Sequence, residues 1–430
     1  MANSISAPAV RKPYDDFPLY PHATGRWAKK VRGKTHFFGT TRGDEDGQKA
    51  LARWKEQQDD LRAGRVPRSK DEAGLRLADL CNKFLAGKRI DQSAGRLSPR
   101  TYVEYARTCG LLIDIFGRDR LVSDLGPVDF ETLYNKLSDK HGLTTIGREV
   151  TMVRSVFKYG LEMDLLDKAV KFGPRFKSPS KTDKRKLRGK NKREHGARVF
   201  TAEEIRRLIE AAPAQLRAMI FLGINGGLGN SDLANLPKSA LDLDGGWIDY
   251  PRVKSGIDRR VPLWPETVAA LRAVIGKTIK AKDAADADMV FLTRTGQRWV
   301  RYDLIEKENE AGKLEVTGRA DDAVAKAFAK LVRELDIYRR GLSFYTLRHN
   351  CETIGGGCRD QVAVDQILGH CDNTMSAEYR EHVEDERLRA VVDHIRSWLL
   401  ESEAQRCADA PAANPKAKSA QEKNLLRVVG

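Results

Sequence analysis

Apolar residues recur at two different spacings along this 430-residue chain. Near the N-terminus, GRWAKKV and KTHFFG alternate apolar and basic residues on either side of Arg32-Gly33, which predicts a β-hairpin with a basic face. A helix is expected to follow over residues 46–63, with a buried stripe formed by Ala50, Leu51, Trp54 and Leu61. These elements predict a small sheet-plus-helix module within residues 17–70, preceded by a disordered polar segment, residues 1–16.

Residues 75–170 carry helical spacing and predict an all-helical domain. Ser98 and Pro99 are suited to the N-cap and first position of a helix. The buried face of that helix is expected to contain Tyr102, Tyr105, Cys109, Leu112 and Phe116. A shorter helix is expected in VDFETLYNKLSDKHG, and another after Thr144-Thr145, with Ile146, Val150, Val153, Phe157 and Leu161 on one face.

The composition changes over residues 171–198, which hold twelve Lys and Arg but only two acidic residues, Asp183 and Glu194. With almost no apolar side chains, this block cannot fold alone and is expected to be a basic linker. A solvated linker and a flexible strap between two DNA-binding domains have the same composition, so both interpretations stay open.

Regular patterns resume at Thr201, which starts the capping box TAEE. Helices are expected up to Ile224, followed by a hairpin of WIDYPRV and RRVPLW around Lys254-Ser255-Gly256. Amphipathic helices are predicted over residues 323–337 and 387–400, and a mobile tail over residues 401–430. The predicted fold is mainly α with small β-sheets (α+β), and its last domain spans residues 199–400.

The charge and the cysteines restrict the function classes. A formal net charge of +16 indicates a polyanionic partner, although ribosomal, RNA-binding and DNA-binding proteins share that property. The six cysteines form no C-x-x-C pair, and the spacings around His349, Cys351, Cys358, His370 and Cys371 match no zinc pattern, so we expect no metal. The N-terminus lacks an apolar signal region and no stretch has the length of a membrane span, so a cytoplasmic protein without membrane contact is expected.

Two segments of the last domain carry candidate chemistry. SFYTLRHN, residues 343–350, places Arg348 beside His349, and LGHCDNTMSAEYR, residues 368–380, places His370 nine residues before Tyr379. Here the chain resembles the tyrosine recombinases, the phage integrase family, whose signature is H-x-L-R-H, then L-G-H and a nucleophilic tyrosine at this separation. The resemblance implies an arm-type DNA-binding module, a helical core-binding domain and a catalytic domain.

The resemblance assigns a role to each residue of this set. Tyr379 is implied to be the nucleophile that forms a 3′-phosphotyrosyl ester, and Arg348 a bidentate clamp on the phosphate. His370 is implied to hydrogen-bond the phosphate, Lys254 to protonate the leaving oxygen, and His349 to support the site. Such transesterification conserves the bond energy, so no cofactor is expected. Singly, each residue also fits packing, helix capping or surface charge; their order and separation favour catalysis.

Two positions depart from the family pattern. Tyr345 stands where the first histidine of the box is usual; its phenol can donate a hydrogen bond but is not cationic near neutral pH. In GGLGNSDLANLP, residues 226–237, Gly229 stands where the family has its first catalytic arginine. That glycine run is no P-loop, because it lacks the following Lys-Ser/Thr. The candidates to replace the missing cation are Arg252, Arg259 and Arg260.

Three functions remain open at this point. The first is a site-specific DNA recombinase or integrase that acts on double-stranded DNA as a dimer or tetramer of identical chains. The second is a catalytically weak or inactive DNA-binding regulator derived from the same family. The third is an RNA-binding protein. Residues 387–400 could pack on a neighbouring copy or within their own chain, and the basic hairpin could read a DNA groove or be only a solvated surface.

Overall fold

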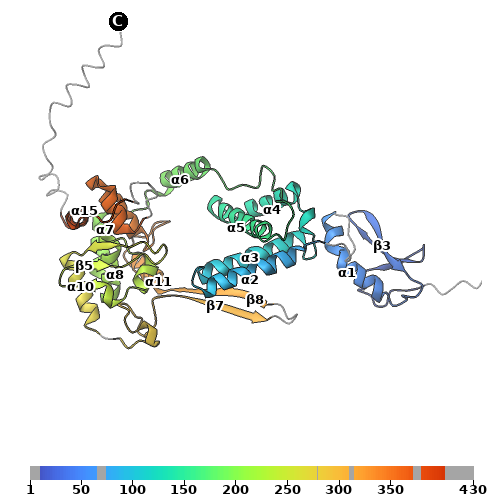
Figure 1. The fold of residues 1–430 in the computed structure, drawn as a ribbon, viewed down its shortest axis with the longest axis horizontal. Helices are drawn as coiled ribbons and strands as arrows, with labels where there is room; N and C mark the ends of the chain where they lie inside the picture. Colours follow the sequence, from blue (N-terminus) through green and yellow to red (C-terminus); the bar gives the residue numbers. More distant parts are fainter. Residues whose placement is uncertain (1–9, 65–73, 278, 309–313, 371–378, 402–430) are drawn as a thin grey trace, which may run out of the picture. The chain divides into compact units, whose positions relative to one another are not determined.

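The computed structural model describes residues 10–64, 74–277, 279–308, 314–370 and 379–401 (Figure 1). The chain divides into two compact units, Met1–Lys186 with Leu304–Gly318, and Leu187–Asp303 with Arg319–Gly430. Of the end segments expected to be disordered or mobile, residues 1–9 and 402–430 lie outside the described residues. Residues 10–16, also expected to be disordered, are described, and the Phe17 N–H donates to the Tyr14 carbonyl at 3.0 Å in a turn there. Among the described helices, none combines the length and apolar character that a membrane span requires.

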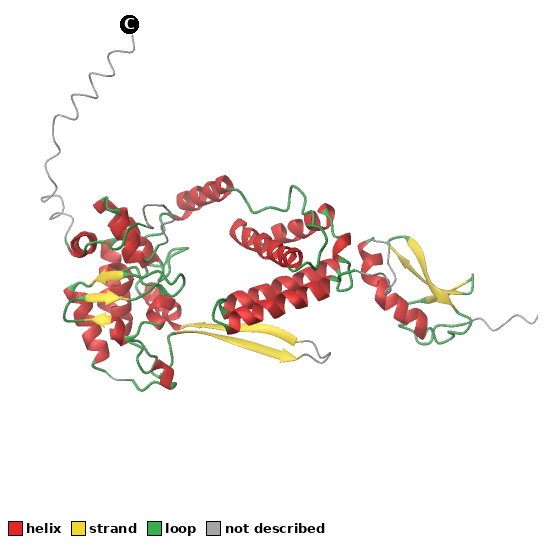
Figure 2. Ribbon diagram, viewed as in Figure 1, coloured by secondary structure: helices red, strands yellow, loops and turns green. Residues whose placement is uncertain are grey.

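The first unit begins with a three-stranded antiparallel sheet in the order β1-β2-β3, followed by a helix (Figure 2). Its elements are β1 (Tyr20–His22), β2 (Arg26–Val31), β3 (Lys34–Thr40) and α1 (Gln48–Ala63). The predicted hairpin is confirmed, with Arg32 and Gly33 both at positive φ in its turn. Strand β1 was not predicted. Trp27 and Trp54 lie in the small core between sheet and helix.

Helices and one short 3-10 turn form the described helical part of this unit. They are α2 (Leu77–Ser93), α3 (Pro99–Phe116), η1 (Val122–Asp124), α4 (Pro127–Lys140) and α5 (Leu143–Glu162). The cap of α3 is the predicted one, since the Ser98 hydroxyl accepts a hydrogen bond from the Thr101 N–H at 3.2 Å. Helix α5 starts earlier than expected, and Leu161 is exposed, because the buried face of α5 ends at Gly160.

The basic block contains a helix that the sequence did not predict, α6 (Lys181–His195). Ser180 and Asp183 cap it reciprocally: the Ser180 hydroxyl accepts from the Asp183 N–H at 3.0 Å, and the Asp183 carboxylate accepts from the Ser180 N–H at 3.2 Å. Lysine and arginine are good helix formers, so a capped run of them is helical without a core. No side chain of α6 is buried.

The second unit packs helices around a small three-stranded sheet, β4-β5-β6 (Figures 1 and 2). Its first elements are α7 (Ala202–Ala211), α8 (Ala214–Asn225), α9 (Asn230–Ala234), η2 (Lys238–Ala240), β4 (Leu241–Asp242), β5 (Trp247–Asp249), β6 (Arg260–Pro262), α10 (Pro265–Ile275) and η3 (Ala284–Asp286). The later elements of this unit are α11 (Ala323–Glu334), α12 (Thr346–Gly355), η4 (Gly356–Cys358), α13 (Gln361–Leu368) and α15 (Asp385–Leu400). Strands β7 (Val300–Glu308) and β8 (Leu314–Asp322) belong to both units, because their residues within Leu304–Gly318 are part of the first. The two-stranded β7–β8 sheet was not predicted.

Helix α15 packs within its own chain. Its apolar stripe is buried, and the Trp264 indole N–H donates to the Val392 carbonyl oxygen at 2.9 Å. The predicted capping box at Thr201 also forms, with Glu204 accepting from the Thr201 N–H at 2.9 Å. Of the two interpretations of residues 387–400, the structure therefore supports packing in cis.

Asn225 fixes the direction of the chain where α8 ends and the glycine run begins. Its side-chain oxygen accepts from the Trp264 N–H and the Thr267 hydroxyl, both at 2.9 Å, and its amide donates to the Pro262 carbonyl at 2.9 Å. We predict that Asn225→Ala lowers the free energy of unfolding by at least about 2 kcal/mol, because it leaves buried partners unsatisfied. Urea denaturation followed by tryptophan fluorescence measures this loss. Asn82→Ala on an exposed face of α2 is the matched control, and an equal loss there would contradict the prediction.

Candidate active site

The glycine run makes a tight turn from α8 into α9. Gly227 has φ of 63°, and a Cβ atom there would lie 2.2 Å from Cδ2 of Leu368, so only glycine fits. Gly229 is the N-cap of α9, and its N–H donates to Oδ2 of Asp232 at 2.9 Å. The segment is therefore a turn into a capped helix, as the sequence suggested.

Position 229 itself has no backbone requirement for glycine, because its φ of −89° suits any residue. The space that a side chain at position 229 would enter is occupied instead. A Cβ atom built on Gly229 would lie 3.3 Å from Cε2 and 3.4 Å from Cδ2 of the Tyr345 ring. The two departures from the family pattern, Gly229 and Tyr345, are therefore in contact, and the aromatic ring covers the place where an arginine side chain would start.

Arg348, on α12, is 2% exposed and connects the glycine run to the C-terminal end of α13. Its guanidinium donates to the carbonyl oxygens of Gly227 at 2.8 Å and Leu368 at 2.7 Å. Burial lowers the pKa of this guanidinium, and the nearby charge of Arg252 lowers the pKa further. Arginine stays protonated at all physiological pH values, so the group is a buried fixed cation with donors left over.

Of the three candidate replacement cations, two lie near Arg348. Arg259 is 3% exposed and donates to Oδ2 of Asp232 at 3.4 Å and to the Tyr250 carbonyl at 3.1 Å. Arg252 donates to the Gly369 carbonyl at 3.3 Å. Arg260 is engaged elsewhere: its guanidinium binds both oxygens of Asp385, at 2.8 and 3.0 Å, and stacks on Trp247. Arg260 therefore serves the packing of α15.

Lys254 lies exposed in the turn between β5 and β6. The turn is closed by hydrogen bonds from the Ser255 and Gly256 N–H groups to the Arg252 carbonyl, at 3.1 and 2.7 Å. It is also attached to the glycine run, because the Val253 N–H donates to Oδ1 of Asp232 at 3.3 Å. Asp232 thus holds the turn of Lys254 and the N-terminus of α9 together.

His370 follows Gly369, which ends α13 in the left-handed conformation at φ 63°. The imidazole Nδ1 lies 3.2 Å from Oδ1 of Asp365, which orients the ring. His370 and Arg380, the neighbour of Tyr379 in sequence, line one cavity of about 360 Å³. Two residues of LGHCDNTMSAEYR, on either side of the undescribed residues 371–378, therefore lie at the same cavity.

The two tyrosines and His349 are exposed. Tyr379 has 80% of its surface accessible, which suits a nucleophile that must reach a large substrate. Tyr345 is 41% exposed, and its ring packs edge-on against His349 one helical turn later, with ring centroids 5.4 Å apart. His349 therefore supports the ring that covers Gly229.

The balance of charge in this cluster is positive. The charge of Arg252 lowers the pKa of the Arg259 and Arg348 guanidiniums, and the Asp232 carboxylate acts on both in the opposite direction. Three guanidiniums against one carboxylate leave a surplus of positive charge, which suits the binding of a phosphate diester. Among the described residues, no group of three or more His, Cys, Asp or Glu side chains could hold a metal ion, and Cys371 lies outside them.

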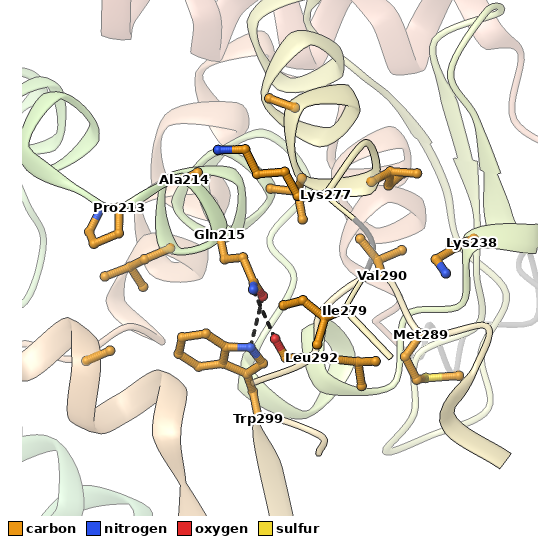
Figure 3. A pocket seen from close by; sticks show the side chains of 15 residues that line it. Pro213, Ala214, Gln215, Lys238, Lys277, Ile279, Met289, Val290, Leu292 and Trp299 are labelled. Atoms are coloured by element: carbon orange, nitrogen blue, oxygen red, sulfur yellow. Dashed lines mark hydrogen bonds between the residues drawn. The ribbon is translucent and has the colours of Figure 1, made fainter. Parts of the chain in front are cut away.

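A separate apolar cavity of about 450 Å³ lies elsewhere in this unit (Figure 3). Gln215 crosses it, receiving a hydrogen bond from the Trp299 indole N–H at 3.1 Å and donating to the Leu292 carbonyl at 2.9 Å. None of the candidate residues lines this cavity. Its lining is mainly aliphatic, and Lys238 and Lys277 are its charged residues.

Sequence reasoning missed the roles of two carboxylates, Asp232 and Asp365. In sequence Asp232 only matches the family frame, whereas its three contacts come from three segments. Asp365 lies five residues before His370, and that short separation was a signal that could have identified it.

Comparison with known proteins gives consistent results. The model of the phage integrase family matches residues 198–386. A crystal structure of a lambda integrase tetramer bound to a Holliday junction aligns with a TM-score of 0.50 and 14% sequence identity, covering 86% of this chain and 98% of that chain. The Tn1549 transposon integrase in complex with transposon right end DNA aligns with a TM-score of 0.51 and 16% identity, covering 75% of this chain and 100% of that chain. No curated protein matches.

These likenesses confirm the predicted fold, which is mainly helical with small sheets and an integrase-like last domain. At 14% and 16% identity, they establish the fold and leave the residue roles as predictions.

The contact between Gly229 and Tyr345 predicts a coupling between the two positions. Gly229→Arg must displace the Tyr345 ring, and we expect it to lower the free energy of unfolding by about 1–3 kcal/mol. With Tyr345→His present, a smaller ring faces the new side chain, so the loss should shrink by about 1 kcal/mol or more. A double-mutant cycle on urea denaturation measures this coupling. If the effects of the two substitutions on the free energy of unfolding are additive, the Tyr345 ring does not occupy the space that the new arginine side chain needs.

Proposed function

Because residues 198–386 belong to the phage integrase family, the tyrosine recombinases, we propose that this chain is a site-specific DNA recombinase or integrase that cuts DNA through a 3′-phosphotyrosyl intermediate. The observation that carries the proposal is the joint arrangement of Arg348, Lys254 and His370 around the glycine turn. Arg348 binds that turn directly, and the loop of Lys254 is attached to it through Asp232. His370 lies two residues after Leu368, the end of α13, whose carbonyl accepts from Arg348.

The proposed reaction is a transesterification at one DNA phosphate. The phenol oxygen of Tyr379 attacks the phosphorus and gives up its proton to water, which has access to this exposed side chain. The bond from phosphorus to the 5′ oxygen breaks, and the electron pair leaves with that oxygen. Lys254 donates a proton to the 5′ oxygen and regains one from solvent. Guanidiniums hold the two non-bridging oxygens, where negative charge concentrates.

Double-stranded DNA is the proposed substrate, and the working form is proposed to be a dimer or tetramer on DNA. The net charge of +16 supports attraction to DNA, and so does the cationic N-terminal sheet, whose β2 contains Arg26, Lys29 and Lys30. The lambda integrase structures contain a tetramer on a Holliday junction and a dimer on a core site.

The nucleophile can be tested with DNA of random sequence. A pool of nicked duplexes with a randomised segment is incubated with the protein, and complexes stable to detergent are isolated and sequenced. We expect the native chain to form covalent adducts and Tyr379→Phe to form none, because phenylalanine has no oxygen to attack phosphorus. Tyr338→Phe removes the hydroxyl of another exposed tyrosine and should leave the adduct yield unchanged.

The second candidate, a DNA-binding regulator without cleavage, rests on one observation, the absence of the arginine at Gly229. Removing one prearranged donor from such a site slows reaction by about a hundred- to a thousandfold. Duplex DNA bound by the native chain without any covalent adduct would favour the regulator over the recombinase. Preferential binding of RNA would contradict both.

Lys254 is expected to act on the leaving group. Lys254→Ala should slow adduct formation about 10²- to 10⁴-fold on normal DNA. A sulfur atom in place of the bridging 5′ oxygen leaves as a thiolate that needs no proton, so the same variant should react there at close to the native rate. Single-turnover adduct formation on both substrates measures the difference, with Lys330→Ala on α11 as control. An equal defect on both substrates would exclude the role as proton donor.

A further inference from the structure

Arg259 has a donor that no described residue uses. Its Nη1 and Nε bind Asp232 and Tyr250, but Nη2 is buried and has no hydrogen-bond partner in the part of the chain that the structure describes. A charged donor that is buried without an acceptor destabilises a protein, because it has lost its hydration without compensation. A bound ligand that accepted a hydrogen bond from Nη2 would remove this cost.

The position of Arg259 relates it to the missing arginine. Oδ2 of Asp232 accepts from the Gly229 N–H at 2.9 Å and from the Arg259 guanidinium at 3.4 Å. One carboxylate oxygen therefore connects Arg259 to position 229, where the family pattern has an arginine. The stem of Arg259 also packs on Gly369, because a Cβ atom there would lie 2.8 Å from its Cγ and Cδ. Gly369 immediately precedes His370. Arg259 therefore lies between position 229, where the family pattern has an arginine, and His370, which is proposed to hydrogen-bond the phosphate.

The surroundings of Arg259 leave its charge only partly compensated. Burial lowers the pKa of its guanidinium, Asp232 opposes that shift, and Arg348 and Arg252 lower the pKa again. Asp232 is shared with backbone N–H groups of Gly229 and Val253. A phosphate diester that entered the site would supply the missing negative charge.

On the basis of the proposed function, we propose that Arg259 is the second phosphate clamp of this enzyme, contacting a non-bridging oxygen of the scissile phosphate in place of the arginine absent at position 229. The guanidinium reaches the site from the strand β6 side of the turn, whereas the family pattern supplies it from the start of α9. The Tyr345 ring above Gly229 fills the space that the change leaves. Arg348 binds the other non-bridging oxygen.

The test compares two phosphates at the cleavage site of a DNA recovered from the randomised pool. One is the normal phosphodiester, and the other is a methylphosphonate, in which one charged oxygen is replaced by a neutral methyl group. Arg259→Gln keeps hydrogen-bonding capacity toward Asp232 but removes the charge. We expect it to slow adduct formation about a hundredfold or more on the phosphodiester and less than tenfold on the methylphosphonate. Arg272→Ala, which removes an exposed ion pair with Asp244, should change neither rate.

The outcomes separate this inference from the proposed function. A defect of equal size on both substrates, or no defect, would overturn the role of Arg259 while leaving the recombinase intact. No adduct from the native chain would overturn the proposed function and this inference with it. If Arg259→Gln unfolds, Arg259→Lys replaces it: we expect a folded protein with a smaller defect that the methylphosphonate again relieves. If the folded Arg259→Lys variant is slowed equally on the phosphodiester and the methylphosphonate, the proposal is overturned as well.

Discussion

The carboxylate of Asp232 is the contact on which the candidate site depends. It is 7% exposed and accepts hydrogen bonds from the backbone of Gly229, the backbone of Val253 and the guanidinium of Arg259. One buried charge therefore fixes the start of α9, the turn that carries Lys254 and a second arginine beside Arg348. A buried carboxylate is stable only when such donors surround it, so the turn, the helix start and the arginine hold one another in place.

The departures from the family pattern form one physical change. Loss of the side chain at Gly229 opens space beside α9, and the Tyr345 ring occupies that space. An imidazole is smaller than a phenol ring and would fill it less completely, so the two substitutions suit each other in packing. The positive charge that the family pattern predicts at position 229 has its proposed counterpart in Arg259, which donates to Asp232 and packs on Gly369. Arg252 donates to the Gly369 carbonyl from the other end of the same turn.

Local elements were predictable where a single segment contains its own signals. The caps at Ser98 and Thr201 and the stripes of α1, α3 and α15 follow from spacing of three to four residues and from hydrogen bonds within one turn. Strand β1 and the β7–β8 pair were missed because a short strand is stabilised by its neighbour, and its own residues carry little signal. Helix α6 was missed because a helix without a buried face has no apolar period.

The residues of the candidate site divide in the same way, into those that the sequence identifies and those that only the fold distinguishes. The sequence identified Tyr379, Arg348, His370 and Lys254 as a set, because their residue types and order carry the family resemblance in linear form. It also exposed the gap at Gly229, since the flanking residues keep the frame. It could not rank Arg252, Arg259 and Arg260, which are close neighbours of the same type. Only folding distinguishes them: the β6 strand directs Arg260 to Asp385 on α15, and places Arg259 against Asp232 beside the glycine turn.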